Sequence, residues 1–149
     1  MQQYYLAQIN IAEAQASIQS AQLQGFVARI EEINNLAEQS PGFIWRLKTE
    51  EGNATSIRAF ANPDMLINMS VWSDIKSLQA FVYRSVHVEL LRQKDSWFSQ
   101  LGSAHQALWW VPVGHIPTLQ EGKQKLALLN SKGPSWEAFT FKELFPAEA

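Results

Sequence analysis

Apolar and polar residues alternate along several stretches of the chain, and each alternation predicts a β-strand with two different faces. The clearest stretch runs from Met65 to Trp72, in which every second side chain is a large apolar one and the intervening face is mixed. Further strands are expected at Tyr4–Ile11, Phe43–Thr49 and Ala107–Gly114, with a short final strand at Ala138–Phe141. We also expect Thr55–Phe60 to extend a hairpin from the second of these strands.

Three other stretches repeat apolar residues at helical spacing. The first helix is expected from Gln19 to Gln39, where Ser40-Pro41-Gly42 stops it. The second follows Ser73 and Asp74, either of which can cap it, and runs to Phe98. The third begins with a capping box, Thr118 to Glu121, and ends at Lys132-Gly133-Pro134.

The second helix carries two apolar stripes on nearly opposite sides, the second of which includes His87. One straight helix would have to bury both sides, so we expect a kink near Arg84-Ser85, with Ser85 capping a second segment. His87 then lies in the first turn of that segment, where the helix dipole opposes its protonation. Two interpretations stay open: a polar group of a functional site, or a neutral core histidine bonded to a backbone carbonyl.

The order of elements predicts an α+β fold, a ferredoxin-like split βαβ antiparallel sheet with two helices on one face. Several strands are apolar on both faces, so the other face of the sheet would be a bare interaction surface. A second copy of the same sheet is its simplest cover. We therefore expect a homodimer with two-fold symmetry.

Composition excludes several classes of function. The length of 149 residues predicts one domain, 1–149. The 12 basic and 14 acidic residues are scattered along the sequence, so they predict no basic surface that would bind nucleic acid. With no cysteine, disulfides, zinc thiolates and iron–sulfur clusters are excluded. No apolar run approaches a membrane span or marks export, so we expect a soluble, cytoplasmic protein that does not bind membranes.

With these elements placed, the sequence resembles an uncharacterised bacterial family of the dimeric α+β barrel superfamily, close to the antibiotic-biosynthesis monooxygenases. The match extends from about Tyr5 to Phe141. The residues that carry it are Asn68-Met69-Ser70-Val71-Trp72, the run from Phe81 to His87, Trp97-Phe98, the run from Leu108 to Pro112, Gly114-His115, Gly133-Pro134 and the run from Glu137 to Phe141.

The resemblance implies a dimeric barrel with a cleft between sheet and helices that holds an aromatic substrate or a haem. In cofactor-free monooxygenases of the superfamily, tryptophan and asparagine hold a phenol whose own carbanion reacts with dioxygen. Haem-degrading relatives use an asparagine on the first strand, a tryptophan that ends the third, and a histidine on the next helix as iron ligand. In this sequence Asn10 lies on the first predicted strand, Trp72 ends the strand before the second helix, and His87 lies on that helix.

The candidate site therefore has His87 as its catalytic base or polar anchor. The residues expected to bind the ligand are Asn10, Asn68, Trp72, Tyr83 and Arg84. No cofactor is required, and haem, with His87 as the only metal ligand, stays an alternative. We interpret His115 as a structural residue of its turn, and the sequence has no nucleophile elbow, phosphate loop or HExxH pair.

Two function hypotheses follow. In the first, the protein is a cofactor-independent, monooxygenase-like enzyme that acts on an aromatic compound. In the second, it is a non-catalytic dimeric protein that uses the same cleft to bind a small apolar ligand. Replacement of His87 separates the two, because it abolishes turnover under the first hypothesis and mainly alters affinity under the second.

Overall fold

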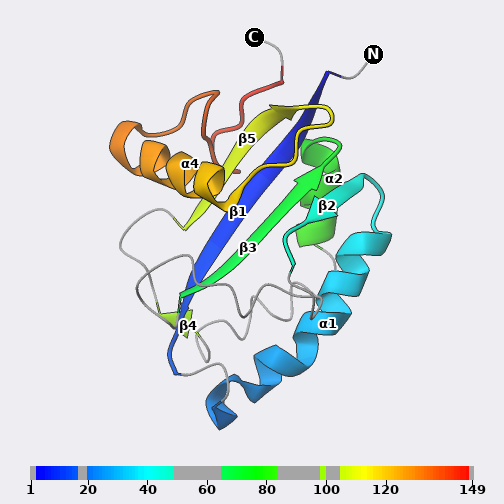
Figure 1. The fold of residues 1–149 in the computed structure, drawn as a ribbon, viewed down its shortest axis with the longest axis vertical. Helices are drawn as coiled ribbons and strands as arrows, with labels where there is room; N and C mark the ends of the chain where they lie inside the picture. The colour runs from blue at the N-terminus through cyan, green and yellow to red at the C-terminus, as the bar shows by residue number, and fades with distance from the viewer. Residues whose placement is uncertain (1–2, 17–19, 49–64, 84–97, 100–104, 148–149) are drawn as a thin grey trace.

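A five-stranded antiparallel sheet with β1 at its centre organises the described part of the chain (Figure 1). The computed structural model describes residues 3–16, 20–48, 65–83, 98–99 and 105–147. The strands are β1 (Tyr4–Ala14), β2 (Phe43–Arg46), β3 (Met65–Trp72), β4 (Phe98–Ser99) and β5 (Gln106–Pro112). The helices are a short 3-10 turn, η1 (Ala21–Leu23), followed by α1 (Gln24–Gln39), α2 (Ile75–Val82) and α4 (Leu119–Lys132).

The strand order is that of a ferredoxin-like split βαβ fold. Along one side β1 pairs with β3, which in turn pairs with β2. Along its other side β1 pairs with β5, and its last residues pair with β4. Because α1 follows β1 and α2 follows β3, the arrangement is the α+β fold that the sequence predicts.

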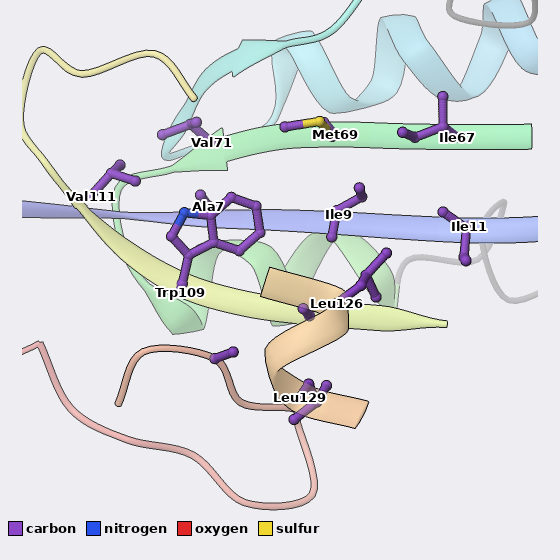
Figure 2. Close-up of a cluster of buried hydrophobic side chains, with 12 residues drawn as sticks. Ala7, Ile9, Ile11, Ile67, Met69, Val71, Trp109, Val111, Leu126 and Leu129 are labelled. Carbon is purple, nitrogen blue, oxygen red and sulfur yellow. The ribbon is translucent and has the colours of Figure 1, made fainter. Parts of the chain in front are cut away.

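Alternation along the three long strands divides the core into two apolar clusters, one on each face of the sheet. The cluster on the side of α1 and α2 consists of Leu6, Ala37, Trp72, Leu78, Phe81, Leu108, Trp110 and Phe139. The cluster on the side of α4 consists of Ala7, Ile9, Ile11, Ile67, Met69, Val71, Ala107, Trp109, Val111, Leu126, Leu129 and Ala138 (Figure 2). The predicted two-helix face is confirmed, and the polar and apolar faces of β1 and β3 are as expected.

The opposite face of the sheet is not bare, which corrects the sequence analysis. Figure 1 shows α4 and α2 on opposite sides of the sheet. Leu126 and Leu129 of α4 contact that second face, where Ile9 and Met69 are 0% exposed. Gly122 permits the close approach, because a Cβ there would come within 2.8 Å of the Ile9 side chain. The apolar surface that was to form a dimer interface is therefore buried within one chain.

Local signals at the helix ends are confirmed. Asp74 caps α2, since its carboxylate accepts a hydrogen bond from the backbone N–H of Ser77 at 2.7 Å. Thr118 caps α4 by accepting the backbone N–H of Glu121 at 3.1 Å. Gly133 follows α4 with a φ of +76°, a conformation that favours glycine.

Two elements differ from those predicted. The second helix was expected to reach Phe98, which is wrong, because Phe98 pairs with β1 in β4. The final strand is reduced to isolated bridges, among them a reciprocal pair of 2.8 Å bonds between Leu108 and Phe139. Both pairings are long-range and leave no local pattern. The expected kink at Arg84-Ser85 and the hairpin at 55–60 lie outside the described residues.

Candidate functional site

A strip of uncharged polar side chains crosses the sheet on the face that α1 and α2 cover. We call Gln8 and Asn10 of β1 with Asn68 and Ser70 of β3 the polar strip. Alternation places all four on the face that carries Trp72. The antiparallel register sets Gln8 opposite Ser70 and Asn10 opposite Asn68, so the four residues form two adjacent cross-strand pairs.

Gln8 holds the polar strip together. Its Nε2 donates to Asn68 Oδ1 at 2.6 Å and to Ser70 Oγ at 2.8 Å, which uses both amide hydrogens. Ser70 Oγ also accepts a hydrogen bond of 2.9 Å from Trp72 Nε1. A hydroxyl has two lone pairs and one proton, so two accepted bonds leave the Ser70 proton to donate to a further acceptor.

Exposure increases along the strip with distance from Trp72. Trp72 is 0% exposed, while Gln8 and Ser70 are 4% and 6% exposed. Asn10 and Asn68 are solvent-exposed. The strip therefore connects the apolar cluster below α1 and α2 with the surface of the molecule.

The buried end of the strip is closed by aromatic packing. Trp72 stacks on Phe81 with a centroid distance of 5.2 Å, and it meets Phe43 edge to face at 5.5 Å. Such packing adds about 0.5–1.5 kcal/mol per aromatic pair beyond the area that it buries. In this position Trp72 supports the strip through its bond to Ser70, and contact between Trp72 and a ligand stays a prediction.

The structure brings together some of the predicted site residues. Asn10 and Asn68 are neighbours in register, and Asn68 joins Trp72 through Gln8 and Ser70. Tyr83 follows the last turn of α2 and is 67% exposed. Arg84 and His87 lie outside the described residues, so their roles stay predictions.

Sequence reasoning missed Gln8 and Ser70, the two buried members of the strip. Gln8 carried a signal, because it is a polar residue in the middle of a mostly apolar central strand. A polar side chain at such a position requires a partner, since an unpaired buried amide costs about 1–3 kcal/mol. The partner depends on the register between β1 and β3, which the sequence does not reveal.

The described residues give no support to the haem alternative. A haem needs a flat slot and an axial ligand. Trp72, the residue expected to crowd the ring, has one face stacked on Phe81 and is fully buried. The expected ligand, His87, lies outside the described residues. We derive no step through haem.

The described part of the chain lacks two further kinds of feature. No group of three or more His, Asp or Glu side chains among those residues is placed to hold a metal ion. None of their helices has the length and apolar character that crossing a membrane requires.

A family match covers nearly the whole chain. The family model described as Domain of unknown function (DUF3291) matches residues 5–149. No curated protein matches the chain. The family match confirms the resemblance to an uncharacterised family.

Solved structures share the fold at low sequence identity. Protein SO0527 from Shewanella oneidensis is 8% identical, with a TM-score of 0.50, and the alignment covers 76% of this chain and 96% of that protein. SnoaB, a cofactor-independent oxygenase from Streptomyces nogalater, is 11% identical, with a TM-score of 0.47 and coverage of 71% and 90%. An antibiotic-biosynthesis-monooxygenase-like protein from Nitrosomonas europaea is 10% identical, with a TM-score of 0.47 and coverage of 78% and 93%.

Proposed function

The chain belongs to the DUF3291 family, and on that premise we propose that it binds a small aromatic compound at the polar strip and acts on it as a cofactor-independent, monooxygenase-like enzyme. The observation that carries the binding proposal is the bonded chain Asn68–Gln8–Ser70–Trp72. It leads from the surface to the edge of an aromatic cluster.

The chemistry of the strip supports an uncharged ligand with a hydrogen-bonding oxygen. The proton of Ser70 is left to donate, and the amides of Asn10 and Asn68 offer both donors and acceptors. All four strip residues are neutral at physiological pH, so they would bind a phenol or a carbonyl better than an anion. An apolar body on the ligand would match the cluster that adjoins the strip.

The catalytic half of the proposal depends on His87. The strip itself holds no side chain that exchanges a proton near neutral pH, so His87 would take the phenolic proton, with Tyr83 and Arg84 binding the resulting anion. The resemblance supplies the rest, namely reaction of the ligand carbanion with dioxygen. The uncharged character of the strip also favours a second candidate function, non-catalytic binding of the same kind of ligand.

Titration with naphthol, followed by calorimetry, tests the binding proposal. Asn68→Ala removes an exposed member of the strip and should weaken binding about tenfold, since a ligand that loses a bond partner forfeits about 1.4 kcal/mol or more. Ser131→Ala is the matched control, because Ser131 is an exposed serine of α4 that bonds only locally, to Leu128. Equal affinity of the Asn68→Ala variant and the parent would contradict the proposal.

Oxygen uptake separates the enzyme from the binding protein. With a phenol that the parent consumes, His87→Ala should abolish oxygen uptake and retain binding. Uptake at the parent rate in that variant would contradict the catalytic role of His87. If the parent protein binds phenols but takes up no oxygen with any of them, the non-catalytic function is favoured.

Assembly and location remain proposals as well. A homodimer rests on the resemblance alone, because α4 buries the face that was to form its interface. Light scattering at increasing protein concentration would measure the mass directly. Cytoplasmic localisation remains an expectation from composition.

A further inference from the structure

A second polar cluster lies beside the sheet face that α4 covers, and it consists of Trp109, Glu121 and His115. Trp109 Nε1 of β5 donates to Glu121 Oε2 at 2.8 Å. The other carboxylate oxygen, Oε1, lies 2.7 Å from His115 Nε2. One carboxylate in the first turn of α4 therefore joins a tryptophan that is 1% exposed to a histidine at the surface.

The backbone on both sides of this cluster is fixed. The N–H of His115 donates to the carbonyl of Pro112 at 3.0 Å, in a turn where Gly114 has a φ of +94°. The N–H of Glu121 donates to Thr118 Oγ1 at 3.1 Å. In the usual capping box the Glu side chain returns to the N-cap amide. Here the carboxylate of Glu121 is directed to Trp109 and His115 instead.

These contacts decide which nitrogen of His115 carries the proton. Burial alone would raise the pKa of Glu121, but the hydrogen bonds from His115 and Trp109 and the nearby charges of His115 and Lys125 lower it below its ordinary value of 4.5. An indole N–H only donates, so Oε2 must be an acceptor. With the carboxylate ionised, His115 must bond through an Nε2–H, and the neutral ring then carries its lone pair on Nδ1.

The side chain of His115 is accessible. It is 44% exposed, and the two nearby apolar residues of the same turn, Val113 and Ile116, are 45% and 46% exposed. An imidazole bonded to a half-buried carboxylate is an arrangement by which proteins hold the ring in one tautomer and orientation. The exposed apolar neighbours would contact the body of a ligand that bonds to Nδ1.

We propose that the turn between β5 and α4 is a second acid–base site, at which Nδ1 of His115 takes a proton from a hydroxyl compound with an apolar body, such as a phenol or an enol. The proton moves from the ligand oxygen to Nδ1, while Glu121 keeps the Nε2–H bonded and does not itself become protonated. Glu121 and Trp109 are positioning residues. This site lies on the opposite side of the sheet from the polar strip and does not depend on the function proposed there.

Nitrogen NMR of the ring measures the tautomer directly. In the parent, neutral His115 should be the Nε2–H form. Glu121→Gln should reverse it: Trp109 can only donate, so the amide must turn its oxygen to the indole and its NH₂ to His115, whose Nε2 must then accept. Trp109→Phe combined with Glu121→Gln frees the amide to rotate and should restore part of the Nε2–H form. An Nδ1–H form in the parent would overturn the proposal.

Hydrolysis of p-nitrophenyl acetate probes whether Nδ1 is reactive. In this reaction Nδ1 attacks the acetyl carbon, p-nitrophenolate leaves, and water then releases acetate and restores the imidazole. Loss of His115 (His115→Gln) should remove the rate above background. Glu121→Gln should lower the rate about tenfold, as is usual when the orienting partner of a histidine is lost.

His105→Gln is the matched control, because His105 is an exposed histidine outside the cluster, and it should retain the parent rate. If the His115→Gln variant folds normally and still hydrolyses p-nitrophenyl acetate at the rate of the parent, the proposal is overturned. Naphthol affinity at the polar strip should be unchanged in His115→Gln, whereas Asn68→Ala should leave the tautomer of His115 unchanged. These two measurements therefore distinguish a wrong proposal for the His115 site from a wrong proposal for the polar strip.

Discussion

Ser70 and Trp72 stand two residues apart on β3 and are joined by a 2.9 Å hydrogen bond from the indole Nε1 to the serine Oγ. Alternation directs both side chains to the same face of the sheet. The bond ties the polar strip to the aromatic cluster around Trp72. The strip is consequently part of the folded core. Substitution of a buried strip residue should therefore lower the stability of the fold as well as weaken ligand binding.

Ser70→Ala should destabilise the fold by about 1–3 kcal/mol, because it leaves the buried N–H groups of Gln8 and Trp72 without their shared acceptor. Urea denaturation measures this loss as a lower midpoint at an unchanged slope. The control Ser131→Ala, on the exposed face of α4, should change stability by less than about 0.5 kcal/mol. Equal midpoints for the two variants would mean that the strip does not contribute to the core.

Helix caps and strand faces were predictable because they depend on residues close in sequence. The acceptors Asp74 and Thr118 stand three residues before the amides that they bind. The faces of β1 and β3 follow from simple alternation, and the packed clusters agree with it.

Features set by long-range pairing could not be predicted in this way. The link between Gln8 and Ser70 requires a register across 62 positions of the chain, and a shift of one residue would separate them. The apolar stripe of α4 indicated that the helix is buried but did not show on which face of the sheet. The cover on that face therefore leaves no signal in the sequence. The contact between His115 and Glu121 also forms only in the folded chain, so the sequence pattern alone indicates a structural role for His115.

Gly42→Ala should destabilise the protein more than Gly114→Ala. Both glycines have positive φ, +85° and +94°, at which an added Cβ costs about 1–2 kcal/mol. At Gly42 the Cβ would also collide with the side chain of Ser77 and lie 2.6 Å from Ser73 Oγ, whereas no heavy atom lies within 4 Å at Gly114. Thermal unfolding should show a loss of roughly 2–5 kcal/mol at Gly42 against about 1–2 at Gly114. Similar losses would contradict the close packing between Gly42 and α2.

The contribution of Glu121 to stability should depend on pH with a defined sign. Its pKa is lower in the folded chain than the ordinary value of 4.5, so protonation favours the unfolded chain. The stabilisation is complete above that value and is lost as the pH falls through the lower, folded pKa. At neutral pH the urea midpoint of unfolding should therefore be higher for the parent than for Glu121→Gln. This difference should become smaller as the pH falls below the ordinary value.

Glu32→Gln is the control for this pH dependence, since Glu32 forms an exposed ion pair with Arg29 at 3.2 Å, and such pairs contribute little. A difference between parent and Glu121→Gln that stays constant from neutral to acid pH would show that the carboxylate charge is not what stabilises the cluster.

The side-chain amide resonances of Gln8, Asn10 and Asn68 give the most direct test of the polar strip as the ligand site. In a titration of the labelled protein with naphthol, these amide signals should shift together and saturate with the dissociation constant that calorimetry measures. The same titration of Ser70→Ala should need a higher naphthol concentration for half saturation. If naphthol binds while the three amide signals stay in place, the ligand site lies elsewhere and the proposed function of the strip is wrong.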